Sequence, residues 1–156
     1  NKLEPGNANY ELAYSCVGVI DYLEGLAKAH GINASGRTAV EAAFDMIADH
    51  EAVLAERLLA YLRGRQDVTI LGDPSSDLET RVPTISFVIE GRSSRKVVEA
   101  VDPSGIGIRF GDFHSKRLVE ALDLGDPDGV IRASAVHYNT LEEMDRLIEQ
   151  LEGLRG

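Results

Sequence analysis

The sequence predicts an α+β fold, with two N-terminal helices (one of them long) followed by a small, mostly antiparallel sheet covered by helices on one face. In the first part of the chain, apolar residues recur at helical spacing. After Gly64 the pattern changes to short alternating apolar runs between short helical stripes. The predicted order there is strand, strand, helix, strand, helix, strand, helix, and the short connections favour antiparallel neighbours.

The first predicted helix follows a polar entry in which Asn7 or Asn9 can act as the N-cap, and Gly31 ends it. Its apolar stripe contains the single cysteine, Cys16, for which core packing is the expected role. One cysteine excludes an internal disulfide framework and fits a reducing compartment. The stripe consists of Leu12, Cys16, Val19, Ile20, Leu23 and Leu26.

The second predicted helix opens at a capping box made by Thr38 and Glu41 and extends to about Arg63. At 1.5 Å per residue its length is roughly 40 Å. Its acidic face is predicted to be solvated, and the first two helices together are expected to expose apolar surface. The residues predicted to face inward are Val40, Phe44, Ile47, Leu54, Leu58 and Leu62.

Four short segments have strand character, and the clearest is 84–90, where Ile85, Phe87 and Ile89 share one face. The others are 68–71, 106–110 and 130–138. The short helices between and after these strands have predicted caps at Ser93 or Ser94, at Ser115, and at Thr140, which forms a capping box with Glu143.

Length and composition indicate one globular domain of 156 residues with a formal net charge of −10. That charge argues against nucleic acid and anionic membranes as partners. The sequence contains no membrane-length apolar run and no signal-peptide pattern, which favours a cytoplasmic protein. Because the chain begins at Asn1 without Met or a targeting segment, we expect a fragment or a processed product.

Polar residues gather at two places that follow or interrupt predicted strands. Arg132 shares a strand face with small residues, where its planar fork is suited to a carboxylate or phosphate; an edge arginine bridging to an acid is the alternative. In the second place, Gly111 permits a sharp turn and Ser115 starts a helix that could face an anion, although the pattern alone favours an ordinary turn. A metal site at Asp112, His114 and His137 is a further, weaker interpretation, because scattered residues of these types are more often structural. No phosphate loop, zinc-ligand spacing or nucleophile elbow is present in the sequence.

Three segments resemble the C-terminal small domain of class V aminotransferases, the fold-type-I pyridoxal-phosphate family that includes the cysteine desulfurases. They read Gly-Ile-Gly-Ile-Arg-Phe-Gly at 105–111, Val-Ile-Arg-Ala-Ser at 130–134 and Tyr-Asn-Thr-Leu-Glu-Glu at 138–143. Residues 2–7 resemble the family's Glu-x-Gly-Thr segment, which precedes the interdomain helix. The resemblance implies an interdomain connector at 1–36 and a small domain at 37–156.

The resemblance also implies roles for individual residues. Arg132, with Arg109, would bind the carboxylate of an amino-acid substrate, while Gly6 and Asn7 would lie near the cofactor phosphate of a neighbouring subunit in a homodimer. The family has Thr at the position of Asn7. His114 occupies the place of the desulfurase cysteine, so persulfide formation is unavailable there, and proton transfer is its candidate catalytic role.

Pyridoxal phosphate is implied for the full-length parent enzyme and is not expected on this chain. The four lysines are Lys2, Lys28, Lys96 and Lys116, and none lies in the strand-to-turn context of a Schiff-base lysine. The expected partners are therefore an amino-acid substrate and the missing large domain. The alternative is a free-standing acidic α+β ligand-binding or regulatory module without catalysis, in which Arg132 is structural.

Overall fold

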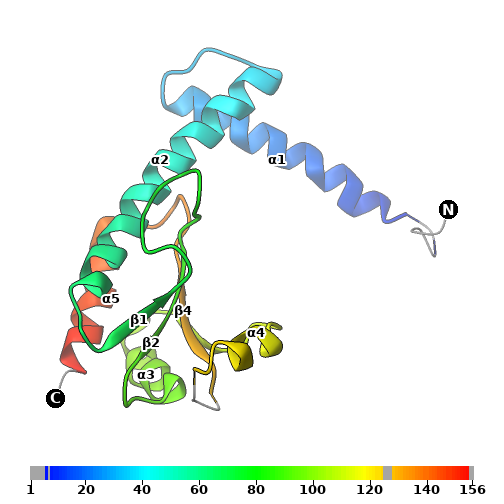
Figure 1. Cartoon of the computed structure of the whole chain (residues 1–156). Coiled ribbons are helices and arrows are strands. Elements are labelled where there is room, and N and C mark those ends of the chain that lie inside the picture. Colours follow the sequence, from blue (N-terminus) through cyan, green and yellow to red (C-terminus); the bar gives the residue numbers. More distant parts are fainter. Residues whose placement is uncertain (1–5, 7, 125–127, 155–156) are drawn as a thin grey trace. The chain divides into compact units, whose positions relative to one another are not determined.

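The computed structural model describes residues 6, 8–124 and 128–154. The chain forms two compact units, Asn1–Ile47 and Ala48–Gly156, and the second contains the sheet (Figure 1). The predicted boundary between residues 36 and 37 concerns the longer enzyme and stays a prediction. No helix among the described residues is long and apolar enough to cross a membrane.

The first unit consists of α1 (Tyr10–Ala29) and the beginning of α2 (Gly36–Arg63). Asn9 caps α1 by accepting a hydrogen bond from the Leu12 amide at 2.9 Å, as predicted, whereas Asn7 lies outside the described residues. Gly31 follows the helix with φ +82°. Small side chains allow the two helices to approach, and the buried cluster consists of Leu23, Ala27, Ala39 and Ala43.

Two predictions for the first unit are wrong. Cys16 is exposed rather than packed in a core, and its Sγ donates to the Leu12 carbonyl at 3.5 Å. The second helix begins at Gly36, two residues before the predicted cap, so Thr38 and Glu41 do not form a capping box. Glu41 instead accepts a hydrogen bond from Arg37 at 2.6 Å, which is an ion pair one helical turn apart.

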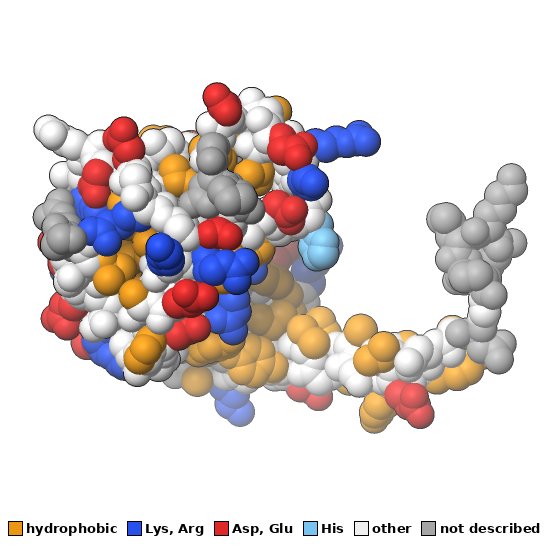
Figure 2. Space-filling model, turned by 90° about the horizontal axis from the view of Figure 1, so that it is seen from below, with side chains coloured by type: hydrophobic (Ala, Val, Ile, Leu, Met, Phe, Trp, Pro, Cys, Tyr) orange, Lys and Arg blue, Asp and Glu red, His pale blue; other side chains and the backbone are white. Residues whose placement is uncertain are grey.

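Much of the apolar surface of α1 is exposed, as predicted for the first two helices. Figure 2 shows apolar side chains gathered along α1. Phe44 on α2 was predicted to face inward and is 55% exposed, because Ala43 and Ala39 hold the buried positions. The exposed large apolar residues of α1 are Tyr10, Leu12, Tyr14, Val17, Val19, Ile20 and Tyr22.

The second unit has a four-stranded sheet of order β1-β2-β4-β3 in which every neighbouring pair is antiparallel. This confirms the predicted α+β class. The strands are β1 (Val68–Leu71), β2 (Thr84–Ile89), β3 (Arg109–Gly111) and β4 (Val130–Ser134).

Two strands are shorter than predicted. The third was expected to begin at residue 106 and begins at Arg109. The fourth was expected to reach residue 138 and ends at Ser134, because Val136 and Asn139 form a turn. In that turn the Val136 amide donates to Asn139 Oδ1 and the Asn139 amide donates to the Val136 carbonyl.

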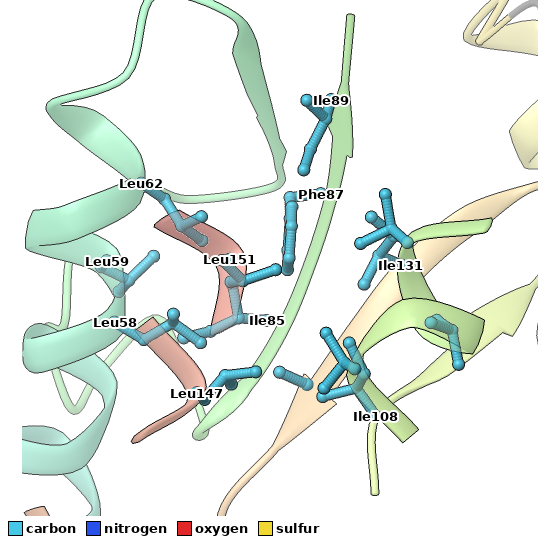
Figure 3. Close-up of a cluster of buried hydrophobic side chains, with 14 of the residues drawn as sticks. Leu58, Leu59, Leu62, Ile85, Phe87, Ile89, Ile108, Ile131, Leu147 and Leu151 are labelled. Carbon is cyan, nitrogen blue, oxygen red and sulfur yellow. The ribbon is translucent and has the colours of Figure 1, made fainter. Parts of the chain in front are cut away.

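The main core lies between one face of the sheet and three helices, which confirms the predicted one-sided cover. Figure 3 shows side chains from α2 and α5 (Leu141–Gly153) pointing toward Phe87 and Ile131 of the sheet. α3 (Ser94–Val101) completes the layer with three buried valines. The fully buried members include Leu58, Leu59, Leu62, Ile85, Phe87, Ile131 and Leu151.

In the second unit, two of the three predicted helix caps are present. Ser93 caps α3 through the Lys96 amide, and Thr140 and Glu143 form the predicted capping box of α5. Ser115 stands at the N-cap position of α4 (Lys116–Ala121) but makes no capping hydrogen bond with its side chain. Its φ of −113° and ψ of 37° are not the extended backbone that an N-cap usually adopts. A short 3-10 helix, Asp102–Ser104, links α3 to the segment before β3.

Candidate functional site

The sheet face opposite the helical core carries two arginines side by side. Arg132 on β4 pairs in register with Arg109 on β3 and with Ser86 on β2. Its neighbours Ile131 and Ala133 are buried in the core, so alternation along the strand places Arg132 on the other side. We call Ser86, Arg132 and Arg109 the arginine face.

Directly opposed residues of an antiparallel pair lie close together, and like charges at such positions destabilise the pair. Arg109 Nη1 donates to the Ile108 carbonyl at 2.9 Å, which occupies one of its donors. Within residues 6, 8–124 and 128–154, neither Arg109 nor Arg132 forms an ion pair with an acid. The arginine face therefore carries a concentrated positive charge that an anion would neutralise.

The partner of Arg132 is an aromatic ring. The guanidinium carbon lies 3.9 Å from the centre of the Phe113 ring, within the range of a cation–π contact. Phe113 belongs to the loop between β3 and α4, which also contains His114. The sequence did not indicate this contact, because an aromatic residue in a turn has no pattern that reveals its partner.

The backbone from the end of β3 into this loop is unusual, since three of its residues have positive φ. Gly111 has φ +138°, Phe113 +49° and His114 +65°. The prediction that Gly111 allows a sharp turn is confirmed. Asp112 holds the loop, because its Oδ1 accepts from the His114 amide at 3.0 Å and its carbonyl accepts from the Ser115 amide at 2.8 Å.

Two glycines bring the strands of the arginine face together. Gly129, with φ +74°, precedes β4, and Gly111 ends β3. A Cβ atom on Gly129 would lie 2.9 Å from the Asp112 amide nitrogen and closer still to the Gly111 carbonyl group. Real Cβ atoms essentially never approach so closely, so only glycine fits at position 129.

The segment between β4 and α5 is held by hydrogen bonds to Glu143. Glu143 Oε2 accepts from the Asn139 side chain and from the Thr140 amide, both at 3.0 Å. These two bonds hold the pKa of Glu143 below its ordinary value of 4.5, and the bond from the Asn139 side chain has the larger effect. Because they favour the charged form, the carboxylate fixes the chain between β4 and α5.

The other predicted site residues belong to different parts of the chain. Gly6 is exposed and belongs to the first unit, and Asn7 lies outside the described residues. The ring of His137 makes an edge contact with Tyr138. No group of three or more His, Cys, Asp or Glu side chains in the described part of the chain is placed to hold a metal ion, so the interpretation with Asp112, His114 and His137 has no support.

Residues 24–147 match the family described as aminotransferase class-V. The chain belongs to this family. It is 45% identical to the aminotransferase-like protein FGM3 of Gibberella zeae over 97% of this chain and 35% of that protein. It is 30% identical to the cysteine desulfurase-like protein ustD of Aspergillus flavus over 97% of this chain and 32% of that protein.

Solved structures agree with the family. The apo cysteine desulfurase from Thermococcus onnurineus NA1 superposes with a TM-score of 0.64 at 25% identity, over 76% of this chain and 28% of that one. The Escherichia coli cysteine desulfurase CsdA, at 21% identity and a TM-score of 0.56, shares the fold. The chain spans about a third of the length of the curated relatives FGM3 and ustD.

Members of this family work with pyridoxal phosphate, but the described residues do not fit a complete cofactor site. Such a site needs a lysine for the Schiff base. Lys28, Lys96 and Lys116 are all exposed on helices, and Lys116 forms an ion pair with Glu120.

Proposed function

We propose that this chain is the C-terminal part of a pyridoxal-phosphate enzyme of the aminotransferase class-V family, and that it binds the α-carboxylate of an amino-acid substrate. Arg132 supplies the main contact and Arg109 adds positive charge beside it. The observation that carries the proposal is the pairing of these arginines on the arginine face without an acid partner among the described residues. A guanidinium presents parallel N–H donors that match a carboxylate.

The lysine and the cofactor pocket belong, in this proposal, to a large domain supplied by the rest of the enzyme. Gly6 and Asn7 approach the cofactor phosphate of a second subunit in a cytoplasmic homodimer. The match to the family over residues 24–147 favours this role over a free-standing acidic module.

His114 distinguishes the proposed enzyme from a cysteine desulfurase that uses a thiolate in this loop. Its side chain is exposed, and an imidazole can both accept and donate a proton. We therefore assign His114 a candidate role in proton transfer within the same site, with a purely structural role in the turn as the alternative.

The test replaces Arg132 by Ala and by Lys in the full-length enzyme and follows the cofactor absorbance during amino-acid titration. A charge-assisted contact is worth about 1.5–3 kcal/mol, so Arg132→Ala should weaken binding by roughly 10- to 150-fold. Arg132→Lys should recover little, because an ammonium group cannot reproduce the fork.

The matched control is Arg57→Ala, which removes an exposed arginine paired with Asp145 on the helical side of the same unit. It should leave amino-acid affinity unchanged. An unaltered affinity in Arg132→Ala would remove Arg132 from the site and end the proposal.

A further inference from the structure

Arg132 has an aromatic partner in a chain that is rich in acids. The sequence holds 26 Asp and Glu residues against 16 Lys and Arg, so a carboxylate partner would be the ordinary outcome for a strand arginine. Instead the Phe113 ring lies 3.9 Å from the guanidinium carbon. Among the described residues no side chain or carbonyl accepts a hydrogen bond from the Arg132 side chain.

This difference in partner matters because a guanidinium has two kinds of surface. A ring occupies a flat face, while the N–H donors lie in the plane and point outward from its edge. A carboxylate partner would take those donors and would have to be displaced by a substrate. A ring leaves them free and shields one face from water, which strengthens electrostatic contacts at the edge.

The loop that presents the ring is built at a conformational cost. Phe113 and His114 both adopt left-handed backbone, which non-glycine residues rarely occupy and which is an outlier for a bulky residue such as Phe113. Such strain persists only where the surroundings fix it. Here the two hydrogen bonds to Asp112 and the contact between the ring and Arg132 provide that restraint.

We propose that Phe113 is a positioning residue for Arg132, holding its guanidinium so that the N–H edge is aimed at the substrate carboxylate. This inference rests on the proposed function and adds the element that orients the arginine. Phe113 acts through Arg132 and requires no chemistry of its own.

The first measurement concerns the contact and needs no substrate. In the ¹⁵N-arginine-labelled full-length apoenzyme, the Arg132 Nε–Hε resonance is assigned by its loss in Arg132→Lys. The Phe113 ring should shift that proton away from the other arginine signals, and Phe113→Leu should abolish the shift while Phe113→Tyr retains it. An unshifted resonance in the wild-type protein would overturn the contact.

The second measurement compares L-alanine with ethylamine, which has the same amine but no carboxylate, in titrations of the full-length holoenzyme. Phe113→Leu should weaken L-alanine binding by about 2- to 30-fold, the range of a cation–π contact, and leave ethylamine unaffected. Phe113→Tyr should restore binding, since its ring also stacks. Turnover of bound amino acid should fall less than affinity.

The control is Arg95→Ala, which removes another arginine–ring contact of this unit, 4.7 Å from Arg95 to the ring of Phe110, together with the ion pair between Arg95 and Asp128. Phe110 follows Arg109 along β3, so its side chain lies on the opposite face of the strand. Arg95→Ala should change neither titration. Equal losses for L-alanine and ethylamine in Phe113→Leu would mean a general structural role and overturn the inference. If Arg132→Ala weakens L-alanine binding and Phe113→Leu does not, the inference fails while the proposed function stands; if Arg132→Ala has no effect, both fail.

Discussion

Replacing Gly129 by Ala should destabilise the second unit more than the same replacement at Gly91 or Gly153. The new Cβ would overlap the Gly111 carbonyl group and lie 2.9 Å from the Asp112 amide nitrogen. These are backbone atoms, which cannot rotate away as a side chain could. In addition, φ of +74° is disfavoured for alanine.

The backbone strain and the overlap of the new Cβ each contribute to the loss of stability. Left-handed backbone costs a non-glycine residue about 1–2 kcal/mol, and overpacking typically adds about 1–3 kcal/mol. The expected loss in the free energy of unfolding is therefore about 2–5 kcal/mol, a large part of the roughly 5–15 kcal/mol of an ordinary domain. The assay is urea unfolding of this chain followed by circular dichroism.

Two matched variants separate strain from overlap. Gly91 has φ +69° with open space around its Cβ position, so Gly91→Ala should show the backbone strain alone. Gly153 lies in α5 with neither feature, and Gly153→Ala should be neutral or slightly stabilising. If Gly129→Ala costs no more than Gly91→Ala, the close approach between Gly111 and Gly129 does not limit this site.

Three further results are expected. This chain alone should not bind pyridoxal phosphate, because its described lysines are exposed on helices; an absorbance band of a bound internal aldimine on the purified chain would contradict this. The full-length enzyme should release little sulfide or alanine from cysteine, because the resemblance places His114 at the position of the desulfurase thiolate. Turnover comparable to that of a true desulfurase would refute this. A large loss of turnover with another amino acid in His114→Ala, with cofactor binding intact, would support the proposed proton transfer. The pKa of Glu143 is lower in the folded chain than its ordinary value of 4.5. The charged Glu143 side chain therefore stabilises the folded chain above pH 4.5, and this stabilisation is lost as the pH falls through the pKa of the folded chain. The stability gap between wild type and Glu143→Gln, measured against Glu149→Gln on the same helix, should therefore close below about pH 4.5, and a gap that persists in acid would point to packing instead.

The sequence was sufficient where a local pattern decides the structure. Thr140 and Glu143 are three residues apart and satisfy each other's backbone amides without help from the rest of the fold. The alternation of Ile85, Phe87 and Ile89 identified the core face of β2. A shift of the strand by one residue would turn all three side chains away from the core, so only one register buries them.

The sequence was insufficient where a distant neighbour decides. The stripe through Cys16 is apolar, yet nothing in a helical period says which part of the stripe has a partner to cover it. Phe44 was predicted inward for the same reason, whereas Ala39 and Ala43 are the residues buried.

Within the candidate site, the position of Arg132 on a strand could be predicted, because that depends on local alternation. Its pairing with Arg109 depends on which strands become neighbours, and its contact with Phe113 depends on left-handed backbone at two non-glycine residues. Neither is coded by propensity, which disfavours such backbone.

The strand order gives the two arginines different freedom of movement. Arg132 lies on β4, which is hydrogen-bonded on both sides, whereas Arg109 lies on β3, a three-residue strand at the edge of the sheet. Local opening begins where few interactions must break, so the edge strand should exchange its amide hydrogens with solvent long before β4 does. Opening β4, which carries the arginine proposed to hold the carboxylate, should cost nearly the full free energy of unfolding of the unit. Its neighbour Arg109, on the edge strand, can adjust to ligands of different size.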